Sequence, residues 1–349
     1  MKPHRARRAA AARGAALLLA LLVVTVVSAL AAGMVWHQWR AVRAETAERA
    51  QAQATWILLG AIDWARLILR EDARGSQIDH LGEPWAVPLE EARLSTFLAN
   101  GREDLDDNPA LQAFVSGRIE DVQARFNLRN LAVEGPQGQA AQRALQRICS
   151  AARVSESTAG RLIEGARRTW MPGRGESQSA DRGALIKPQH LDDLAWWGVD
   201  GASIERLRPW LVVLPRPSAL NLNTASAEMI AASVEGVDPS AAQRLVQARN
   251  RSPLRSVQQA LTLLQGPGSG GAAGAGTAGA GTAGAPAGAG TPGAGEASGA
   301  IPLDVQSAYF EIRGRLRLDG RVFEERVLVE RRQLEVQVVH RQRVTGSPT

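Results

Sequence analysis

The densest group of potential metal ligands in this sequence lies in a short polar stretch that ends at Pro109. Carboxylate and amide oxygens are the ligands that Ca²⁺ prefers, but the spacing here is not that of a helix–loop–helix calcium motif. A turn that leads into a helix at Pro109 explains the same composition. Calcium binding and a structural turn therefore both remain open, and no metal ligand is assigned. The members of the stretch are Glu103, Asp104, Asp106, Asp107 and Asn108.

The other chemistry-bearing residues do not form a catalytic set. Cys149 is the only cysteine, and its apolar helical surroundings favour a packed thiol over a reactive one. The glycine-rich tract at residues 266–300 lacks the Lys-Ser or Lys-Thr ending of a phosphate-binding loop. The histidines show no metal-ligand spacing. They are His4, His37, His80, His190 and His340. We predict that the protein is not an enzyme and requires no cofactor.

Cleavage of the peptide bond between Gly14 and Ala15 is expected. Five basic residues and no acidic residue precede Gly14, and they account for five of the six net positive charges of the chain. Residues 15–36 are then uncharged and long enough to cross a bilayer, which takes about 20 helical residues. Because glycine leaves the backbone accessible to a peptidase at the membrane surface, this order predicts a leader that is cut between Gly14 and Ala15.

Two other interpretations of the N-terminus remain open. A secretory signal would be cut after the small-x-small sequence at residues 29–31, which leaves Ala32 as the first residue. An uncleaved anchor needs only the hydrophobic run. In the anchored forms, the basic residues keep the N-terminus in the cytoplasm and place everything after the run outside. The near-neutral remainder gives little support to nucleic acid as a partner.

A single long helix is predicted from residue 15 to residue 70. The stretch after the hydrophobic run contains no proline, and its apolar residues recur mostly at three- and four-residue steps. Such a helix would be about 84 Å long. The recurring residues are Trp39, Val42, Trp56, Leu59, Ile62, Ala65 and Leu69.

These features resemble the K family of minor pseudopilins from type II secretion systems. The resemblance is carried by the junction at Gly14, a helical segment at residues 56–66 and a segment at residues 117–128. It covers most of the chain outside residues 266–300, and it implies a pilin-like α/β domain interrupted by a helical domain. Pilins and pseudopilins usually have Glu at the fifth mature position, where this chain has Leu19. Because an unpaired charge in an apolar filament core is costly, omission of the Glu suits the end of a filament.

Residues 136–265 are predicted to form the inserted helical domain, and they contain an internal repeat. The sequence Gly-Val-Asp at residues 198–200 recurs at residues 236–238. Each copy is expected to form a helix, a tight glycine turn and a second helix. The nearby tryptophans are expected to pack in the core rather than to form a binding platform. They are Trp196, Trp197 and Trp210.

The second copy of the repeat resembles a helix-hairpin-helix module, a fold often used to grip DNA. Its basic residues offer a face for phosphate, although a solvated helix surface accounts for them as well. They are Arg244, Arg249, Arg251 and Arg255. Asp200 and Asp238 follow the hairpin glycines and repel phosphate. The pattern Asn-x-Asn-Thr-Ala at residues 221–225 also occurs in the insertion of K pseudopilins, where the resemblance implies a structural part. Relatives that bind calcium carry an acidic loop in the insertion, but residues 174–182 here contain only Glu176 and Asp181.

The remaining segments are predicted to be strands and a linker. Residues 123–128 alternate apolar and polar residues, which predicts a half-buried strand. Residues 266–300 are almost entirely Gly, Ala, Thr, Ser and Pro, which predicts a disordered linker. Short strands are expected from residue 308 to residue 338, with Asp319-Gly320 as a hairpin turn. Residues 301–349 would complete a sheet that begins within residues 37–135.

The expected fold class is α+β, with a leader (residues 1–14), a transmembrane segment (residues 15–36), a pilin-like domain and an inserted all-α domain. The expected function is that of a minor pseudopilin at the tip of a periplasmic pseudopilus, where it would initiate and cap the fibre for export of folded proteins. Expected partners are the I- and J-type minor pseudopilins, the major pseudopilin, the prepilin peptidase and the inner membrane. A DNA-binding competence protein is the alternative.

Overall fold

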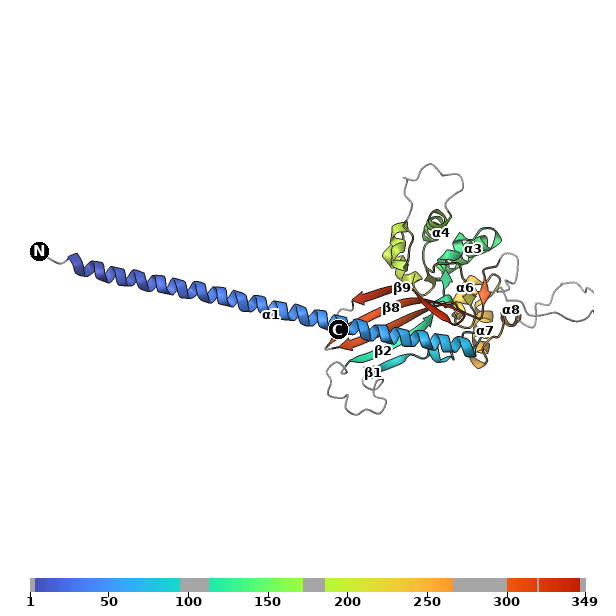
Figure 1. The fold of residues 1–349 in the computed structure, drawn as a ribbon. Coiled ribbons are helices and arrows are strands. Elements are labelled where there is room, and N and C mark those ends of the chain that lie inside the picture. The colour runs from blue at the N-terminus through green and yellow to red at the C-terminus, as the bar shows by residue number, and fades with distance from the viewer. Residues whose placement is uncertain (1–3, 95–112, 172–185, 266–299, 319, 346–349) are drawn as a thin grey trace, which may run out of the picture.

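The computed structural model describes residues 4–94, 113–171, 186–265, 300–318 and 320–345. Its first element is the helix α1 (His4–Gly75), whose 72 residues span about 108 Å. The helix is continuous, as expected, but it extends beyond the predicted range at both ends. Its N-terminal part projects away from the rest of the molecule (Figure 1). Within the described residues, it is the one helix that is long and apolar enough to span a membrane.

The C-terminal part of α1 packs across one face of a sheet through a stripe of residues that recur every three or four positions. The buried stripe consists of Ala50, Ala54, Leu58, Ile62, Ala65 and Leu69. Of the residues whose periodicity predicted the helix, Ile62, Ala65 and Leu69 belong to this stripe, whereas Trp39, Val42 and Trp56 are exposed. The alanines of the stripe let the helix lie close to the sheet, because their side chains are small. Gly314 on the facing strand serves the same purpose, because a Cβ there would lie 3.2 Å from Leu58 Cδ2.

The main sheet has five antiparallel strands in the order β1-β2-β7-β8-β9. The first two are β1 (Leu89–Arg93) and β2 (Phe114–Asp121), which precede the helical body. The last three are β7 (Tyr309–Leu318), β8 (Arg321–Arg332) and β9 (Glu335–Thr345). These last strands are longer than the short strands expected from the sequence, because exposed charged residues continue the alternation of buried and exposed positions. Gly320 has φ +73° beside the β7–β8 turn; Asp319 lies outside the described residues.

A helical body is inserted into the hairpin formed by β2 and β7. Asp121 at the end of β2 pairs with Phe310 at the start of β7, so both ends of the insertion lie side by side. Phe126 and Ile301 belong to the same buried cluster as the helices between them. Between residues 122 and 308, the described residues of the helical body therefore extend beyond the expected range of residues 136–265 at both ends. The reason is that flanking apolar residues on both sides complete the helical core.

The helical body contains short 3₁₀ helices, α-helices and two pairs of two-residue parallel strands. The 3₁₀ helices are η4 (Val122–Ala124), η5 (Leu128–Ala132) and η6 (Leu191–Trp197). The α-helices are α3 (Pro136–Ala151), α4 (Glu156–Trp170), α5 (Gly201–Leu207), α6 (Ala227–Ser233), α7 (Pro239–Arg251) and α8 (Val257–Gln265). The strands β3 (Phe126–Asn127) and β4 (Leu211–Val212) form one pair, and β5 (Leu220–Asn221) and β6 (Leu303–Asp304) form the other.

The predicted strand at residues 123–128 is wrong for all but two residues. Phe126 and Asn127 form β3, but 3₁₀ helices lie on either side. The polar side chains of Gln123 and Asn127 are buried rather than exposed, because both form hydrogen bonds with the backbone of residues 214–219. Gln123 Nε2 donates to the carbonyl oxygen of Ala219 at 3.0 Å. Tertiary hydrogen bonds therefore override the period-two pattern.

The internal repeat has the predicted turn geometry. Gly198 and Gly236 both adopt φ +78°, the left-handed conformation that glycine accommodates readily. Asp200 and Asp238 then cap the following helices: their side chains accept hydrogen bonds from the amides of Ser203 and Ala241, both at 2.9 Å. The acidic residue after each glycine thus has a local role in beginning a helix. The first helix of the first copy is the 3₁₀ helix η6 rather than an α-helix.

Candidate functional site at the junction of α1, the sheet and the helical body

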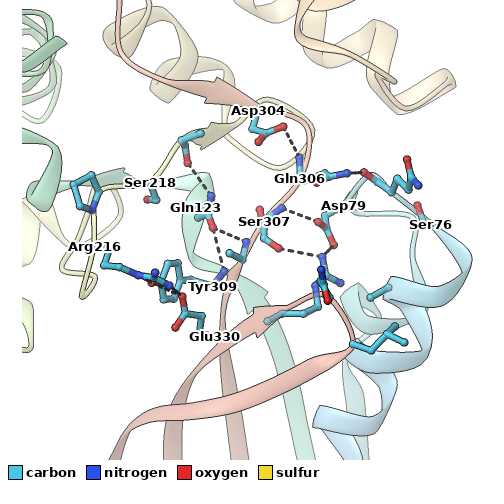
Figure 2. Close-up of a pocket in the computed structure, with 18 residues that line it drawn as sticks. Ser76, Asp79, Gln123, Arg216, Ser218, Asp304, Gln306, Ser307, Tyr309 and Glu330 are labelled. Atoms are coloured by element: carbon cyan, nitrogen blue, oxygen red, sulfur yellow. Dashed lines mark hydrogen bonds and ion pairs between the residues drawn. The ribbon is translucent and has the colours of Figure 1, made fainter. Parts of the chain in front are cut away.

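A polar cleft of 820 Å³ lies where the end of α1, the start of β7 and the helical body meet. Figure 2 shows side chains from all three parts converging on it. Gln123 bridges across its floor, because its Oε1 accepts hydrogen bonds from the amides of Ala308 at 2.6 Å and Tyr309 at 3.1 Å. Arg216 forms an ion pair with Glu330, and the Tyr309 hydroxyl donates to the same carboxylate at 2.8 Å. The cleft therefore joins segments that are far apart in the sequence.

Asp121 is the centre of a buried network beside the cleft. Its Oδ2 accepts hydrogen bonds from the hydroxyls of Thr224 and Ser307, both at 2.6 Å, and from Asn221 Nδ2 at 3.0 Å. Burial raises the pKa of the Asp121 carboxyl above its ordinary value, although these hydrogen bonds oppose the shift. Asn221 also donates to the carbonyl oxygen of Asp79 at 3.1 Å. One side chain of the Asn-x-Asn pattern thus connects the helical body to the sheet and to the loop after α1.

The second asparagine of the pattern holds the helical body together internally. Asn223 Nδ2 donates to the carbonyl oxygen of Leu254, and Asn223 Oδ1 accepts from the Leu254 amide, both at 2.9 Å. Arg249 is buried beside it and donates to the carbonyl oxygen of Leu222. Burial lowers the pKa of Arg249 to about 10. Arg249 is therefore part of the interior, which corrects the expectation that it lies on a solvated basic surface.

Arg331 on β8 fastens the end of α1 to the sheet. Its guanidinium forms ion pairs with Asp72 at 3.0 Å and with Asp79, and it also donates to the Ser307 carbonyl oxygen at 3.0 Å. Burial is the largest cause that raises the pKa of Asp79, to about 6, and Arg331 opposes it. The pKa of Asp72 is also raised, first by burial and then by the charge of Glu83. Since breaking a buried pair leaves an uncompensated charge, Arg331 is expected to be important for stability.

The predicted site residues lie elsewhere, and the structure does not bring them to this junction. Gly14 and Ala15 lie within α1, and the Leu19 side chain is 63% exposed on the projecting part of the helix. The acidic stretch at residues 103–108, all of residues 174–182 and residues 266–299 lie outside the described residues. The sequence prediction missed the carboxylates Asp79 and Asp121. The available signal for Asp121 was its position at the end of a segment with an apolar pattern, where a carboxylate is close to buried residues.

The remaining predicted residues have mixed outcomes. Cys149 is buried in the core of the helical body, as predicted, and burial raises the pKa of its thiol to about 11. Trp197 is buried and its ring packs edge-on against Trp170 with 5.4 Å between ring centroids. Trp210 is partly buried against the same core, but Trp196 is 51% exposed, so core packing is wrong for that residue.

The side chains at the junction cross-link elements that are far apart in the sequence. Its carboxylates are occupied by hydroxyl, amide and guanidinium donors, and the side chains connect α1, β2, β8 and the helical body. The described fold and site thus define a class: a protein with one potential membrane-spanning helix, whose continuation packs on an antiparallel sheet that carries an inserted helical body.

Comparison with known proteins identifies the family. Residues 220–280 match the family model for type II secretion system protein K. The chain is 30% identical over 263 residues to the type II secretion system protein K of Pseudomonas aeruginosa, with 70% of this chain and 74% of that protein covered. The chain belongs to the type II secretion system protein K family. Its function is that of a minor pseudopilin in type II protein secretion, and the DNA-binding alternative gains no support.

A solved structure shares the fold. A chain in the crystal structure of the GspK-GspI-GspJ complex from the enterotoxigenic Escherichia coli type 2 secretion system matches with a TM-score of 0.56 and 18% sequence identity. The match covers 86% of this chain and 99% of that chain. It supports the α+β fold class expected from the sequence, with a long N-terminal helix ahead of a mixed helical and sheet structure.

Proposed function

We propose that this protein is the tip subunit of the pseudopilus, which it initiates and caps for the export of folded proteins across the outer membrane. The observation that carries the proposal is the architecture in Figure 1: the continuous helix α1 leads into a sheet that carries an additional helical body. The inserted residues 122–308 exceed the usual size of a small pilin domain, which is below about 150 residues. Their bulk would hinder a further subunit from stacking above this one.

Leu19 supports the same position in the fibre. A carboxylate at this place needs a positively charged partner when it is surrounded by apolar helices. Leucine removes that need, as suits a terminal subunit. We expect Leu19→Glu to weaken co-purification with the other minor pseudopilins, whereas Leu19→Ile leaves it unchanged. A clear gain in assembly for Leu19→Glu would contradict the terminal position.

We infer that α1 anchors the protein in the inner membrane and that the globular part lies in the periplasm. Expected partners are the I- and J-type minor pseudopilins, the major pseudopilin and the prepilin peptidase. A solved complex that contains GspI and GspJ together with GspK supports the first of these. We expect the role to be structural rather than enzymatic, and we expect the protein to need no catalytic cofactor.

Processing of the leader tests the proposal most directly. We expect a prepilin peptidase to cut between Gly14 and Ala15, because the uncharged helix then remains intact for transfer into the fibre. N-terminal sequencing of the full chain from cells with and without the peptidase distinguishes the interpretations. A start at Ala15 that depends on the peptidase supports the proposal, and Gly14→Val should block the cut. A start at Ala32 in both strains would overturn it.

A further inference from the structure

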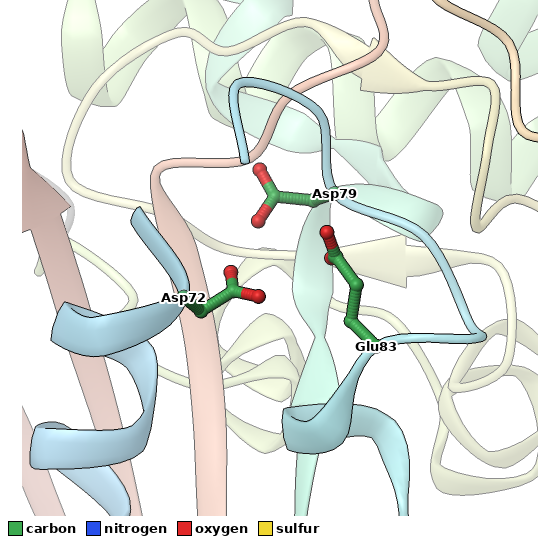
Figure 3. Close-up of side chains that lie close together, drawn as sticks. All are labelled: Asp72, Asp79 and Glu83. Carbon is green, nitrogen blue, oxygen red and sulfur yellow. The ribbon is translucent and has the colours of Figure 1, made fainter. Parts of the chain in front are cut away.

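Three carboxylates meet where α1 ends and the chain turns back toward the sheet. Asp72 lies in the last turns of α1, Asp79 lies in the following loop, and Glu83 immediately precedes the 3₁₀ helix η1 (Pro84–Ala86). Figure 3 shows the three side chains facing one another across this loop. One oxygen from each carboxylate lies within 4.8 Å of the others. All three side chains are more than nine-tenths buried.

Positive charge does not balance this cluster. Arg331 pairs with Asp72 and Asp79, but it forms no ion pair with Glu83 among the described residues. Glu83 Oε2 accepts hydrogen bonds from Trp85 Nε1 at 2.7 Å and from the His80 amide at 3.0 Å. Glu83 Oε1 is buried and has no hydrogen-bond partner in the described part of the chain; His80 Nε2 lies 3.7 Å away. A buried carboxylate oxygen without a hydrogen bond is costly. A further positively charged group at this place would therefore stabilise the cluster.

We propose that Asp72, Asp79 and Glu83 bind a divalent cation of the calcium type, with Glu83 Oε1 as the ligand that otherwise has no partner. Ca²⁺ binds carboxylate oxygens at about 2.3–2.6 Å in a flexible geometry, whereas Mg²⁺ demands a near-ideal octahedron at about 2.0–2.1 Å. Three oxygens that lie within 4.8 Å of one another can contact a single ion of the calcium type. The remaining coordination positions would be taken by water. Asp79 and Arg331 also line the 820 Å³ cleft, which supplies a route for the ion.

The ion would strengthen the place where α1 is attached to the rest of the molecule. Asp72 belongs to α1, Glu83 precedes the turn that buries Trp85 against Phe310, and Asp79 connects to Ser307 and Asn221. A ligand that binds the folded state alone raises stability in proportion to the logarithm of its concentration above its Kd. CaCl₂ should therefore raise the Tm of the protein, and EGTA should lower it.

Terbium luminescence gives a test that reports on location. The full-length protein in detergent is titrated with Tb³⁺ and then with CaCl₂ while tryptophan is excited. Trp85 donates a hydrogen bond to Glu83, so an ion at this site lies close to its indole ring. We expect sensitised Tb³⁺ emission that CaCl₂ displaces, and loss of both the emission and the calcium-dependent rise in Tm in Glu83→Gln.

The matched control is Glu164→Gln, which removes an exposed carboxylate paired with Arg167 and Arg168 on α4. It should retain the emission. If circular dichroism shows that Glu83→Gln is unfolded, Asp72→Asn takes its place, and the calcium-dependent Tm of the unaltered protein is an independent measure. Emission that survives in a folded variant with either substitution would locate the ion elsewhere and overturn the proposal. Absence of any calcium effect on Tm and of any emission would also overturn it.

Discussion

Cys149 shows how burial controls the chemistry of a single residue. Its thiol is 1% exposed and its pKa is raised to about 11, so near pH 8 it remains protonated and inaccessible. We expect the folded protein not to react with Ellman's reagent at about pH 8, and to react fully once unfolded in guanidinium. Ser157→Cys in a Cys149→Ala background is the control, because Ser157 is exposed and its replacement should react at once. Rapid reaction of the unaltered folded protein would contradict the packed thiol.

His340 gives the contact between β9 and the helical body a dependence on pH. Its ring packs edge-on against His190, with 4.3 Å between ring centroids. Burial, and then the proximity of His190, lower the pKa of His340 below its ordinary value of 6.5, while Asp193 opposes the shift. The unfolded chain therefore takes up a proton at higher pH than the folded chain does, and the stability from this pair is lost as the pH falls below about 6.5.

Measurement of the Tm at about pH 7, 6 and 5 checks this expectation, because this range spans the ordinary histidine pKa. The Tm of the unaltered protein should fall more steeply with acidification than that of His340→Gln, because glutamine does not titrate. The other titrating groups are common to both proteins, so the difference between the two profiles reports on His340 and its contact with His190. Identical pH profiles for the two proteins would show that the histidine contact has no part in stability.

At the scale of elements, α4 packs against η6 through a glycine. A Cβ added to Gly165 would lie 2.3 Å from the Trp197 ring, so Gly165→Ala must displace a buried indole. Such overlap typically costs about 1–3 kcal/mol, which exceeds the helix-propensity gain of about 1 kcal/mol. Gly160 lies on the same helix with no atom within 4 Å of an added Cβ. Gly160→Ala should therefore stabilise, and Gly165→Ala should destabilise.

Chemical denaturation of the two variants measures both changes in the free energy of unfolding. The comparison is well matched, since each variant adds one methyl group to α4. Equal effects of the two substitutions would mean that η6 is not held against α4 as the structure describes.

At the scale of the whole molecule, the insertion can be removed at its structural boundaries. Because Asp121 and Phe310 are paired, replacement of residues 122–308 by Asn-Gly leaves a three-residue loop, Asn-Gly-Tyr309, between them and should close β2 and β7 into a hairpin. Deletion of residues 136–265 should instead leave Phe126, Leu128 and Ile301 without their core, since all three belong to the buried cluster of the helical body. We expect the first variant to fold in the membrane and the second to be degraded or to aggregate.

Membrane fractionation and limited proteolysis of the two variants test this boundary. In secreting cells, the variant that lacks residues 122–308 should also lose control of pseudopilus length or number, because the proposed cap is absent. If the variant that lacks residues 136–265 proves the more stable, the helical body would not extend to the residues assigned here.

The sequence by itself determined the features that depend on neighbouring residues. The uncharged run and its continuing helical periodicity predicted one long helix, and α1 confirms it. The repeated Gly-Val-Asp predicted two tight turns, because a left-handed glycine and a capping aspartate act within a few residues. The family resemblance is likewise confirmed by the comparisons.

Only the tertiary structure decided which residues meet across the fold. Ion pairing between Arg331 and Asp79 joins positions 252 residues apart, and no local pattern encodes such a partner. Contact with the sheet determines which side of α1 is buried: Leu58 and Ile62 are covered, whereas Trp56, which shares the helical periodicity, is exposed. The boundaries of the helical body were also decided by packing, since Phe126 and Ile301 enter its core from opposite ends of the insertion. Periodicity shows that a face is apolar, but complementary surfaces determine what covers it.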